Sequence, residues 1–151
     1  YYASRGLGDV YKRQELKILN GGIVMATRML HTCIRVMDLE KSLEFYKNAL
    51  GLVETRRKDF PEHKFTLVYL SDTPDGYEIE LTYNYDPEKP YDLGNGFSHV
   101  AIGADDIVSL REKHMEMGYE VTDLKGLPGE PPRYYFVTDP DGYKVEVIIN
   151  K

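Results

Sequence analysis

Apolar and polar residues alternate along several short stretches of the chain, and in two places the alternation gives way to a helical spacing. The first alternating stretch begins at His31, and within residues 38–50 the apolar side chains then recur every three or four positions, as on one face of a helix. Gly51 follows as a typical C-terminal stop. Residues 65–72 and 77–84 alternate again on either side of a Thr-Pro-Asp-Gly turn, which predicts two strands.

The whole pattern then repeats. A second alternating stretch begins at His99, and a second helical spacing follows Asp105 or Asp106, either of which can cap the helix. Residues 134–139 and 143–149 alternate on either side of an Asp-Pro-Asp-Gly turn. The sequence therefore predicts a strand, a helix and a few strands, twice over.

Histidine and glutamate occupy matching positions in the two copies. His31 and His99 each open a copy, and Glu80 and Glu146 lie in the closing strands, 49 and 47 residues later. Successive strand residues point to opposite faces, so we expect the apolar face to pack on the helix and the other face to be free to line a site. The free face holds His31, Arg35, Glu80, Asn84, His99 and Glu146.

The repetition of the His and Glu pairs favours a metal site over ordinary solvent-exposed strand residues. A single strand histidine or glutamate usually only meets water. Two imidazoles and two carboxylates at matching positions can converge around a pseudo-twofold axis, and nitrogen and oxygen donors suit a first-row divalent metal. Four such ligands would leave one or two coordination positions open, as a catalytic metal requires.

Composition narrows the class of protein. The net charge of -6 has the wrong sign for binding nucleic acid through its phosphates, and no run approaches the roughly 20 apolar residues that span a bilayer. Cys33 is the only cysteine, so no intrachain disulfide can form, and we expect a cytoplasmic protein.

The first residues do not fit the repeated pattern. Residues 1–24 lack periodicity and the features of a signal peptide, so we expect a non-native or disordered extension there, with Met25 as the natural start. Residues 25–151 are then expected to form a single domain, with one copy at about 27–85 (module 1) and the other at about 97–150 (module 2).

Three segments carry a resemblance to a known family. HTCIRVMDLEKSLEFYKNALGL, YEIELTYNYDPEKPYDLGNGFSHVAI and DPDGYKVEVI resemble the signature segments of the glyoxalase I family (lactoylglutathione lyases) in the vicinal oxygen chelate superfamily. The resemblance covers essentially residues 25–151. It implies an α+β fold of two tandem βαβββ modules whose curved mixed sheets surround a metal site.

The resemblance also implies an activity and roles for individual residues. Members isomerise the hemithioacetal of methylglyoxal and glutathione, or a related thiol, to a lactoyl thioester such as S-lactoylglutathione. The four metal ligands would be His31, Glu80, His99 and Glu146. Glu146 matches the principal base of the family, and Glu80 would act on the other face of the substrate. Arg35 and Asn84 match positions that hold the glutathione moiety.

The metal and the oligomeric state follow from the same resemblance. A histidine at position 31, together with the compact length, resembles the bacterial members activated by Ni²⁺ or Co²⁺ rather than Zn²⁺. Family precedent implies a homodimer in which the module 1 ligands of one chain face the module 2 ligands of the other. The expected partner is otherwise a small-molecule substrate, with no nucleic acid and no membrane.

Two other functions use the same architecture. One is an acyl-thioester epimerase of the methylmalonyl-CoA type, and the segment ending in Asn84 argues against it because that segment resembles the glutathione-binding strand. The other is a metal-free drug-binding protein of the bleomycin-resistance type, against which the retention of all four ligands argues. We expect His63 and His114 to be solvated or packed, with no ligand role, and Cys33 to be a small packing residue.

Overall fold

The computed structural model describes residues 17–19, 22–24 and 27–150. The chain divides into two compact units, residues 1–30 and 31–151. In the first unit, β1 (Lys17–Leu19) pairs with β2 (Gly22–Val24) in an antiparallel ladder. The expectation that residues 1–24 are an extension falls mostly outside the described residues, and Met25 lies outside them. No helix in the described ranges is long and apolar enough to cross a membrane.

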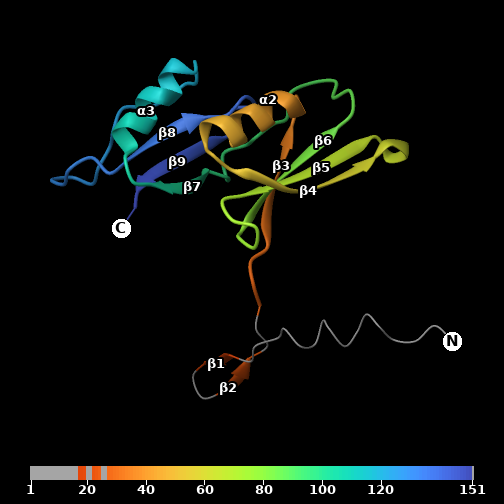
Figure 1. The fold of residues 1–151 in the computed structure, drawn as a ribbon, viewed down its shortest axis with the longest axis horizontal. Coiled ribbons are helices and arrows are strands. Elements are labelled where there is room, and N and C mark those ends of the chain that lie inside the picture. Colours follow the sequence, from red (N-terminus) through yellow and green to blue (C-terminus); the bar gives the residue numbers. More distant parts are fainter. Residues whose placement is uncertain (1–16, 20–21, 25–26, 151) are drawn as a thin grey trace. The chain divides into compact units, whose positions relative to one another are not determined.

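Module 1 forms a four-stranded mixed sheet in the order β3-β6-β5-β4, in which β3 and β6 are parallel and the other pairs antiparallel (Figure 1). Its elements are β3 (His31–Val36), α2 (Leu39–Glu44), the π-helical η1 (Phe45–Ala49), β4 (Val53–Phe60), the 3₁₀ turn η2 (Pro61–His63), β5 (Phe65–Ser71) and β6 (Glu78–Asn84). The expected helix over residues 38–50 is thus present, but its last turns are π-helical.

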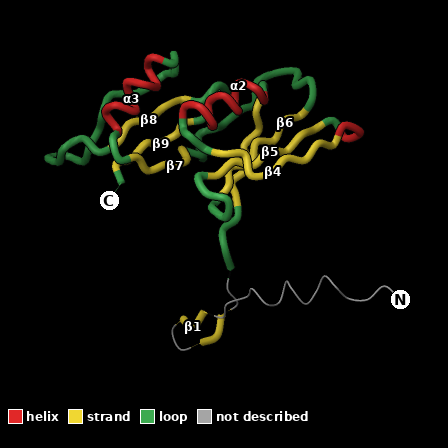
Figure 2. Tube along the Cα trace, in the orientation of Figure 1, coloured by secondary structure: helices red, strands yellow, loops and turns green. Residues whose placement is uncertain are grey.

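Module 2 repeats the order with a smaller sheet, β7-β9-β8 (Figure 2). In this sheet β7 and β9 are parallel, and β8 and β9 are antiparallel. Its elements are β7 (His99–Ala104), α3 (Ile107–Glu116), β8 (Tyr134–Thr138) and β9 (Lys144–Ile149). Where module 1 has β4, module 2 has only two isolated bridges, which join Val121 to Val137 and Lys125 to Tyr134. Two mixed sheets from βαβββ-like modules confirm the predicted α+β fold.

The ends of both helices follow the predicted signals. Asp38 accepts a hydrogen bond from the Lys41 N–H at 3.1 Å, and Asp106, rather than Asp105, accepts from the N–H groups at the start of α3. Gly51 and Gly118 terminate the two helices with φ of +75° and +85°, a backbone conformation that glycine adopts without steric cost.

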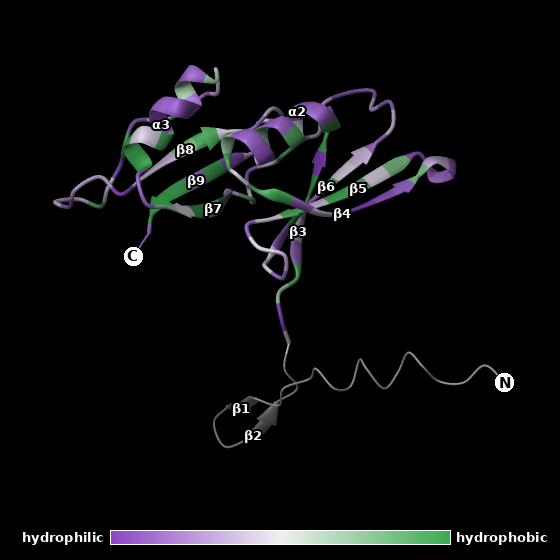
Figure 3. Ribbon diagram, in the orientation of Figure 1, coloured by the Kyte–Doolittle hydropathy of each residue, from purple (hydrophilic) through white to green (hydrophobic). Residues whose placement is uncertain are grey.

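The apolar faces of the strands form one continuous core with the helices. Ile34 and Val36 on β3, Leu81 on β6, and Val145 and Val147 on β9 are buried, as their alternation predicts. Hydrophobic residues, green in Figure 3, recur along the strands of both sheets. α2 packs on β6, and α3 packs on β8 and β9. The opposite strand face, with its histidines and glutamates, is thereby left uncovered by the helices.

Buried polar groups link the two modules. The Tyr46 hydroxyl of η1 donates to the Asp139 carboxylate of module 2 at 2.9 Å. A side chain of module 2 likewise contacts module 1, since Nε2 of the fully buried His114 lies 2.8 Å from the Ala49 carbonyl. The Nδ1 of His114 lies 3.0 Å from the Tyr135 hydroxyl of its own module. These bonds fix the two sheets in one unit because a buried polar group costs stability when it loses its partner.

Candidate metal and substrate site

The first half of the predicted site lies on β3 and β6. The parallel register places Glu80 next to Cys33, two residues along β3 from His31. His31 Nε2 lies 3.1 Å from Glu80 Oε2, with the carboxylate largely buried and the imidazole about one-third exposed. We call these two residues the β3–β6 pair.

The second half repeats this geometry on β7 and β9. His99 Nε2 lies 3.1 Å from Glu146 Oε2, the same separation as in module 1. The Ser98 hydroxyl lies 2.7 Å from His99 Nδ1 and so orients the imidazole from its other nitrogen. We call His99 and Glu146 the β7–β9 pair.

Hydroxyl groups surround the carboxylate of module 1. Thr82 Oγ1 donates to Glu80 Oε1 at 3.0 Å, and the Cys33 thiol lies 3.2 Å from the same Thr82 oxygen. Burial favours a higher pKa for Glu80, but hydrogen bonds from Tyr69, Thr82 and Cys33 outweigh it and the pKa is lowered. The carboxylate is therefore held in its ionised form, as a metal ligand must be.

Within the described part of one chain, the β3–β6 pair and the β7–β9 pair do not come together into one ligand set. In the part of the chain that the structure describes, no group of three or more histidine, cysteine, aspartate or glutamate side chains is arranged to hold a metal ion. Each sheet presents two donors, one nitrogen and one oxygen, so a four-ligand shell requires two such pairs to meet.

Arg35 and Asn84 lie beside the β3–β6 pair, on the same strands. Arg35 is exposed and lines a recess of about 350 Å³ together with Tyr91 and Tyr143. The Asn84 side-chain N–H donates to the Tyr91 hydroxyl at 2.9 Å, which connects Asn84 to the same recess. The structure therefore brings the two predicted substrate-binding residues to one place through Tyr91, which the sequence did not single out.

Two expectations about individual side chains can be compared with the structure. The expectation that Cys33 is a small packing residue is wrong, because Cys33 is exposed on the site face and contacts Thr82. The cause is the strand alternation, which places it on the same face as His31 and Arg35. His63 is exposed and His114 is completely buried.

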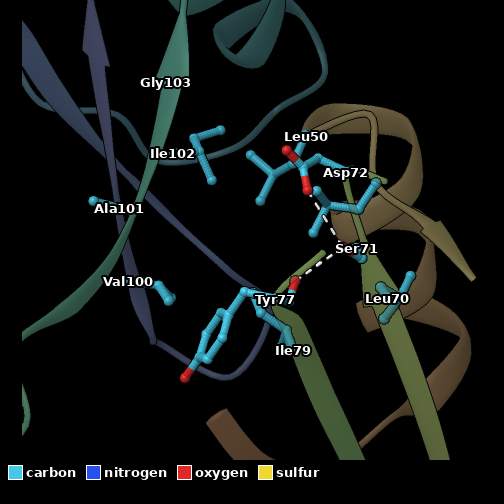
Figure 4. Close-up of a pocket in the computed structure, with 11 residues that line it drawn as sticks. Leu50, Leu70, Ser71, Asp72, Tyr77, Ile79, Val100, Ala101, Ile102 and Gly103 are labelled. Carbon is cyan, nitrogen blue, oxygen red and sulfur yellow. Dashed lines mark hydrogen bonds between the residues drawn. The ribbon is translucent and has the colours of Figure 1, made fainter. Parts of the chain in front are cut away.

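A second recess lies away from these residues. Figure 4 shows it between the end of η1, strands β5 and β6, and the edge strand β7. Its volume is about 300 Å³, and apolar side chains such as Leu50, Ile79 and Ile102 form most of its wall. The Ser71 hydroxyl points to the Tyr77 carbonyl at 2.9 Å and is thus already satisfied. None of the predicted site residues lines this recess.

Comparison with known proteins places this geometry in a family. Residues 28–147 match the model of the glyoxalase/bleomycin resistance protein/dioxygenase superfamily. The chain is 45% identical over 127 residues to a lactoylglutathione lyase of Neisseria meningitidis, covering 82% of this chain and 91% of that protein. It is 43% identical over 127 residues to that of Haemophilus influenzae, covering 82% and 93%.

A solved structure agrees with the sequence comparisons. The trypanothione-dependent glyoxalase I of Leishmania major superimposes with a TM-score of 0.75 at 37% sequence identity, covering 82% of this chain and 87% of that chain.

Proposed function

The chain belongs to the glyoxalase I family, the lactoylglutathione lyases that detoxify methylglyoxal, and we propose that it carries out this reaction with a divalent metal held by the β3–β6 and β7–β9 pairs. The observation that carries the proposal is the repetition of one His–Glu pair, at the same 3.1 Å separation, in both modules. Membership of the family itself implies a divalent metal.

The donor set fits such a metal. Two imidazole nitrogens and two carboxylates are the ligands that first-row divalent ions accept, and they leave coordination positions open for a substrate. The hydroxyl groups around Glu80 and the Ser98 contact to His99 are the outer partners that orient such ligands.

The reaction moves one proton between neighbouring carbon atoms. When bound, the metal withdraws electron charge from the oxygen atoms of the hemithioacetal and makes the C1 proton more acidic. We assign Glu146 as the base that takes this proton from C1 and delivers it to C2, while the hydroxyl proton on the C1 oxygen passes to the C2 oxygen. The product has a thioester at C1 and a hydroxyl at C2. Glu80 occupies the matching position on the other side. The overall change is an isomerisation, so no atoms or electrons are gained or lost.

The recess lined by Arg35 is the proposed position of the thiol portion of the substrate. A guanidinium can form two parallel hydrogen bonds with a carboxylate, and the amide of Asn84 can both donate and accept, as a peptide ligand such as glutathione demands. The position of Arg35 on β3 and of Asn84 on β6, the two strands that carry the β3–β6 pair, supports this assignment.

The experiment that tests the proposed reaction follows thioester formation from a preformed methylglyoxal–glutathione hemithioacetal by ultraviolet absorbance. The metal-loaded protein is expected to form the thioester, and the same preparation stripped of metal is expected to lose this activity and regain it on reloading. A protein that binds no divalent metal, or that leaves the hemithioacetal unchanged when loaded, would contradict the proposal.

The preferred metal is proposed to be Ni²⁺ or Co²⁺. The nitrogen donor at position 31 supports this choice, and the general order of metal affinities does not decide it, because geometry at the open positions selects the active ion. Stripped protein is expected to regain more activity with Ni²⁺ or Co²⁺ than with Zn²⁺. Best reactivation by Zn²⁺ at equal occupancy would overturn this choice and leave the ligand assignment intact.

The active unit is proposed to be a homodimer with shared sites, in which the β3–β6 pair of one chain meets the β7–β9 pair of the other. The separation of the two pairs within the described part of one chain supports this arrangement. Pairing also covers edge strands such as β3 and β7, which otherwise offer unpaired backbone groups.

Complementation between two inactive proteins tests the shared site. One carries alanine at His31 and Glu80, and the other carries alanine at His99 and Glu146. After joint unfolding and refolding, each heterodimer collects all four changes in one site and keeps the other site intact, so random pairing restores about a quarter of the sites. Absence of activity, with heterodimers shown to be present, would contradict the shared-site arrangement.

A further inference from the structure

The two proposed ligand carboxylates have different neighbours although their strands match in register. In module 1, Glu80 lies opposite Cys33 on β3 and Tyr69 on β5, and Thr82 follows two residues later on the same face. In module 2, the corresponding neighbours of Glu146 are Ala101, Phe136 and Ile148. Every neighbour that can form a hydrogen bond in module 1 is replaced by an apolar residue in module 2.

This difference determines how each carboxylate is bound. Both oxygens of Glu80 are engaged, since Oε2 lies 3.1 Å from His31 and Oε1 accepts from Thr82 at 3.0 Å. Because the Thr82 hydrogen is donated to Glu80, the Cys33 thiol is the donor in the 3.2 Å contact to the Thr82 oxygen. The result is a continuous chain of donors that ends on Glu80.

Glu146 has no such support. Among the side chains that the structure describes, only His99 forms a polar contact with its carboxylate. The rings of Phe136 and His99 pack in an edge-on arrangement, with 5.3 Å between ring centroids and an interplanar angle of 72°. Phe136 offers no hydrogen-bond donor to the Glu146 carboxylate. The Ser98 hydroxyl contacts the histidine and not the glutamate. Lys144, which pairs with His99 in register, bonds to Glu120 and Thr138 instead.

We propose that Thr82 and Tyr69 are positioning residues that keep Glu80 a fixed metal ligand, and that the apolar residues at the matching positions leave Glu146 free to move. This inference rests on the proposed metal site and adds a physical reason why two carboxylates at matching positions of the repeat would play different roles. A carboxylate with both oxygens engaged loses a hydrogen bond when it rotates, whereas Glu146 can leave a metal without breaking any bond to the protein beyond that to His99.

Contacts with Arg56 and His31 hold the Tyr69 ring in place. The Arg56 guanidinium lies 3.5 Å above the centre of the Tyr69 ring, and Arg56 forms an ion pair with Glu78 at 2.8 Å. The His31 ring packs against Tyr69 in an edge-on arrangement, with 5.6 Å between ring centroids. Tyr69 is thus held between Arg56 and one member of the β3–β6 pair.

The experiment makes each module resemble the other. Thr82→Val and Tyr69→Phe remove the hydroxyls from module 1 and keep the shape of the side chains, and Thr82→Ser retains a hydroxyl as the rescue variant. Ile148→Thr places a donor at the matching position of module 2. For each full-length protein, Co²⁺ affinity is measured by competition with a chelator, the visible absorption spectrum of bound Co²⁺ is recorded, and kcat and KM are measured at saturating metal.

The module 1 changes are expected to act on the metal. Thr82→Val is expected to weaken Co²⁺ binding by about tenfold or more, the loss typical of an outer partner of a ligand, and to alter the Co²⁺ spectrum. Tyr69→Phe is expected to act in the same direction, and Thr82→Ser is expected to restore both readouts. Ile148→Thr is expected to lower kcat without weakening Co²⁺ binding, because it ties down Glu146.

The outcomes separate this inference from the proposed function. If the unsubstituted protein binds Co²⁺ and Thr82→Val binds it equally well with an unchanged spectrum, the positioning role is wrong and the metal site stands. If Thr82→Ser fails to restore what Thr82→Val loses, the hydroxyl is not responsible and the inference is also wrong. An unsubstituted protein that binds no Co²⁺ would overturn the metal site and the positioning role together.

Discussion

Module 1 and module 2 have the same order of elements but use their polar residues in different places. Module 1 gathers hydroxyl groups around Glu80, and its Thr-Pro-Asp-Gly turn is exposed at Asp75. Module 2 surrounds Glu146 with apolar residues, and the aspartates of its Asp-Pro-Asp-Gly turn bind module 1 instead. The comparison indicates that a repeated module can keep its site geometry while its remaining polar groups are divided between tuning that site and fixing the two copies together.

The helical segment of each module also carries one buried polar side chain that forms a hydrogen bond with the other module. Tyr46 and His114 occupy matching positions, each eight residues after the N-cap aspartate of its helix. Each is fully buried, and each is hydrogen-bonded to the other module. Tyr46 reaches a side-chain carboxylate, whereas His114 reaches a backbone carbonyl and also the Tyr135 hydroxyl. Because His114 forms two hydrogen bonds and Tyr46 forms one, we expect His114 to contribute more to the free energy of unfolding.

The largest expected difference between the modules concerns the two carboxylates. Glu146→Gln is expected to lower kcat/KM by at least about a hundredfold, because it weakens the proposed base and a ligand together. Glu80→Gln is expected to act mainly on metal affinity, so that part of its activity returns at saturating Co²⁺. The measurement is the hemithioacetal assay over a range of Co²⁺ concentrations.

The exposed His63 supplies the control for this pair. His63→Ala is expected to leave kcat, KM and metal affinity unchanged. If saturating Co²⁺ rescued Glu146→Gln and left Glu80→Gln inactive, the roles of the two modules would be the reverse of those assigned.

The next largest effect concerns the matching helix positions. His114→Ala is expected to lower the free energy of unfolding by about 3 kcal/mol, because it opens a cavity and leaves the Tyr135 hydroxyl and the Ala49 carbonyl without a partner. Tyr46→Phe keeps the ring and deletes one hydrogen bond, for which about 1–2 kcal/mol is expected. Urea denaturation of the two variants and the starting protein measures both values. Equal losses would contradict the expectation that the buried His114 side chain stabilises the protein more than the Tyr46 hydroxyl does.

The titration of His114 gives a smaller effect with a definite sign. Burial lowers the pKa of His114 below its usual 6.5. As the pH falls below about 6.5, the unfolded chain takes up a proton that the folded chain refuses, so the folded state loses stability, at most about 1.4 kcal/mol per pH unit for one group. Above that pH the contribution is fully present.

Asp139 has the opposite sign in an overlapping range. Burial raises its pKa to about 6, so the folded state gains stability from this group as the pH falls from 6 toward the ordinary value of 3.8. The His114 contribution is isolated by comparing the starting protein with His114→Asn between pH 5 and 7.5, since Asp139 is present in both. The starting protein is expected to lose stability relative to the variant below pH 6.5. Parallel curves would show that His114 does not resist protonation.

The sequence was sufficient for the parts of the fold that depend on local periodicity. The strands at His31 and His99, the cap at Asp38 and the stop at Gly118 follow from alternation, capping and backbone preference. The placement of His31 and Glu80 on one face of the sheet was also accessible, because strand alternation and the repeat both predict it. These features depend on nearby residues or on the duplication.

The features that the sequence analysis did not identify depend on register and on contacts between distant segments. β4 (Val53–Phe60) is an edge strand whose polar residues face water on much of both sides, so it lacks a clear alternation. The contact of Tyr69 with Glu80 requires the register of β5 against β6, which the sequence does not supply. Thr82 could have been found, since it lies two residues after Glu80 on the same face of a strand.

The smallest expected difference separates the two turns, which share a Pro-Asp-Gly sequence. Asp141 Oδ1 accepts a hydrogen bond from the Met37 N–H at 2.9 Å, and its Oδ2 lies 3.4 Å from the Ser42 hydroxyl, so the turn of module 2 holds the start of α2 in module 1. Asp75, its counterpart, is exposed. Asp141→Ala is expected to cost about 1 kcal/mol in the free energy of unfolding, whereas Asp75→Ala is expected to remain within about 0.5 kcal/mol of the starting protein.

The same substitution within a shared Pro-Asp-Gly-Tyr sequence makes this pair a test of tertiary context. Both changes remove the carboxylate between the proline and the glycine, although of the two turn glycines only Gly142 has a positive φ, of +97°. Urea denaturation with unchanged m-values would assign the remaining difference to the contacts of Asp141 with Met37 and Ser42. If Asp75→Ala destabilised the protein as much as Asp141→Ala, the aspartate would act within the turn in both modules, and the anchoring role of module 2 would rest on Asp139 and His114 alone.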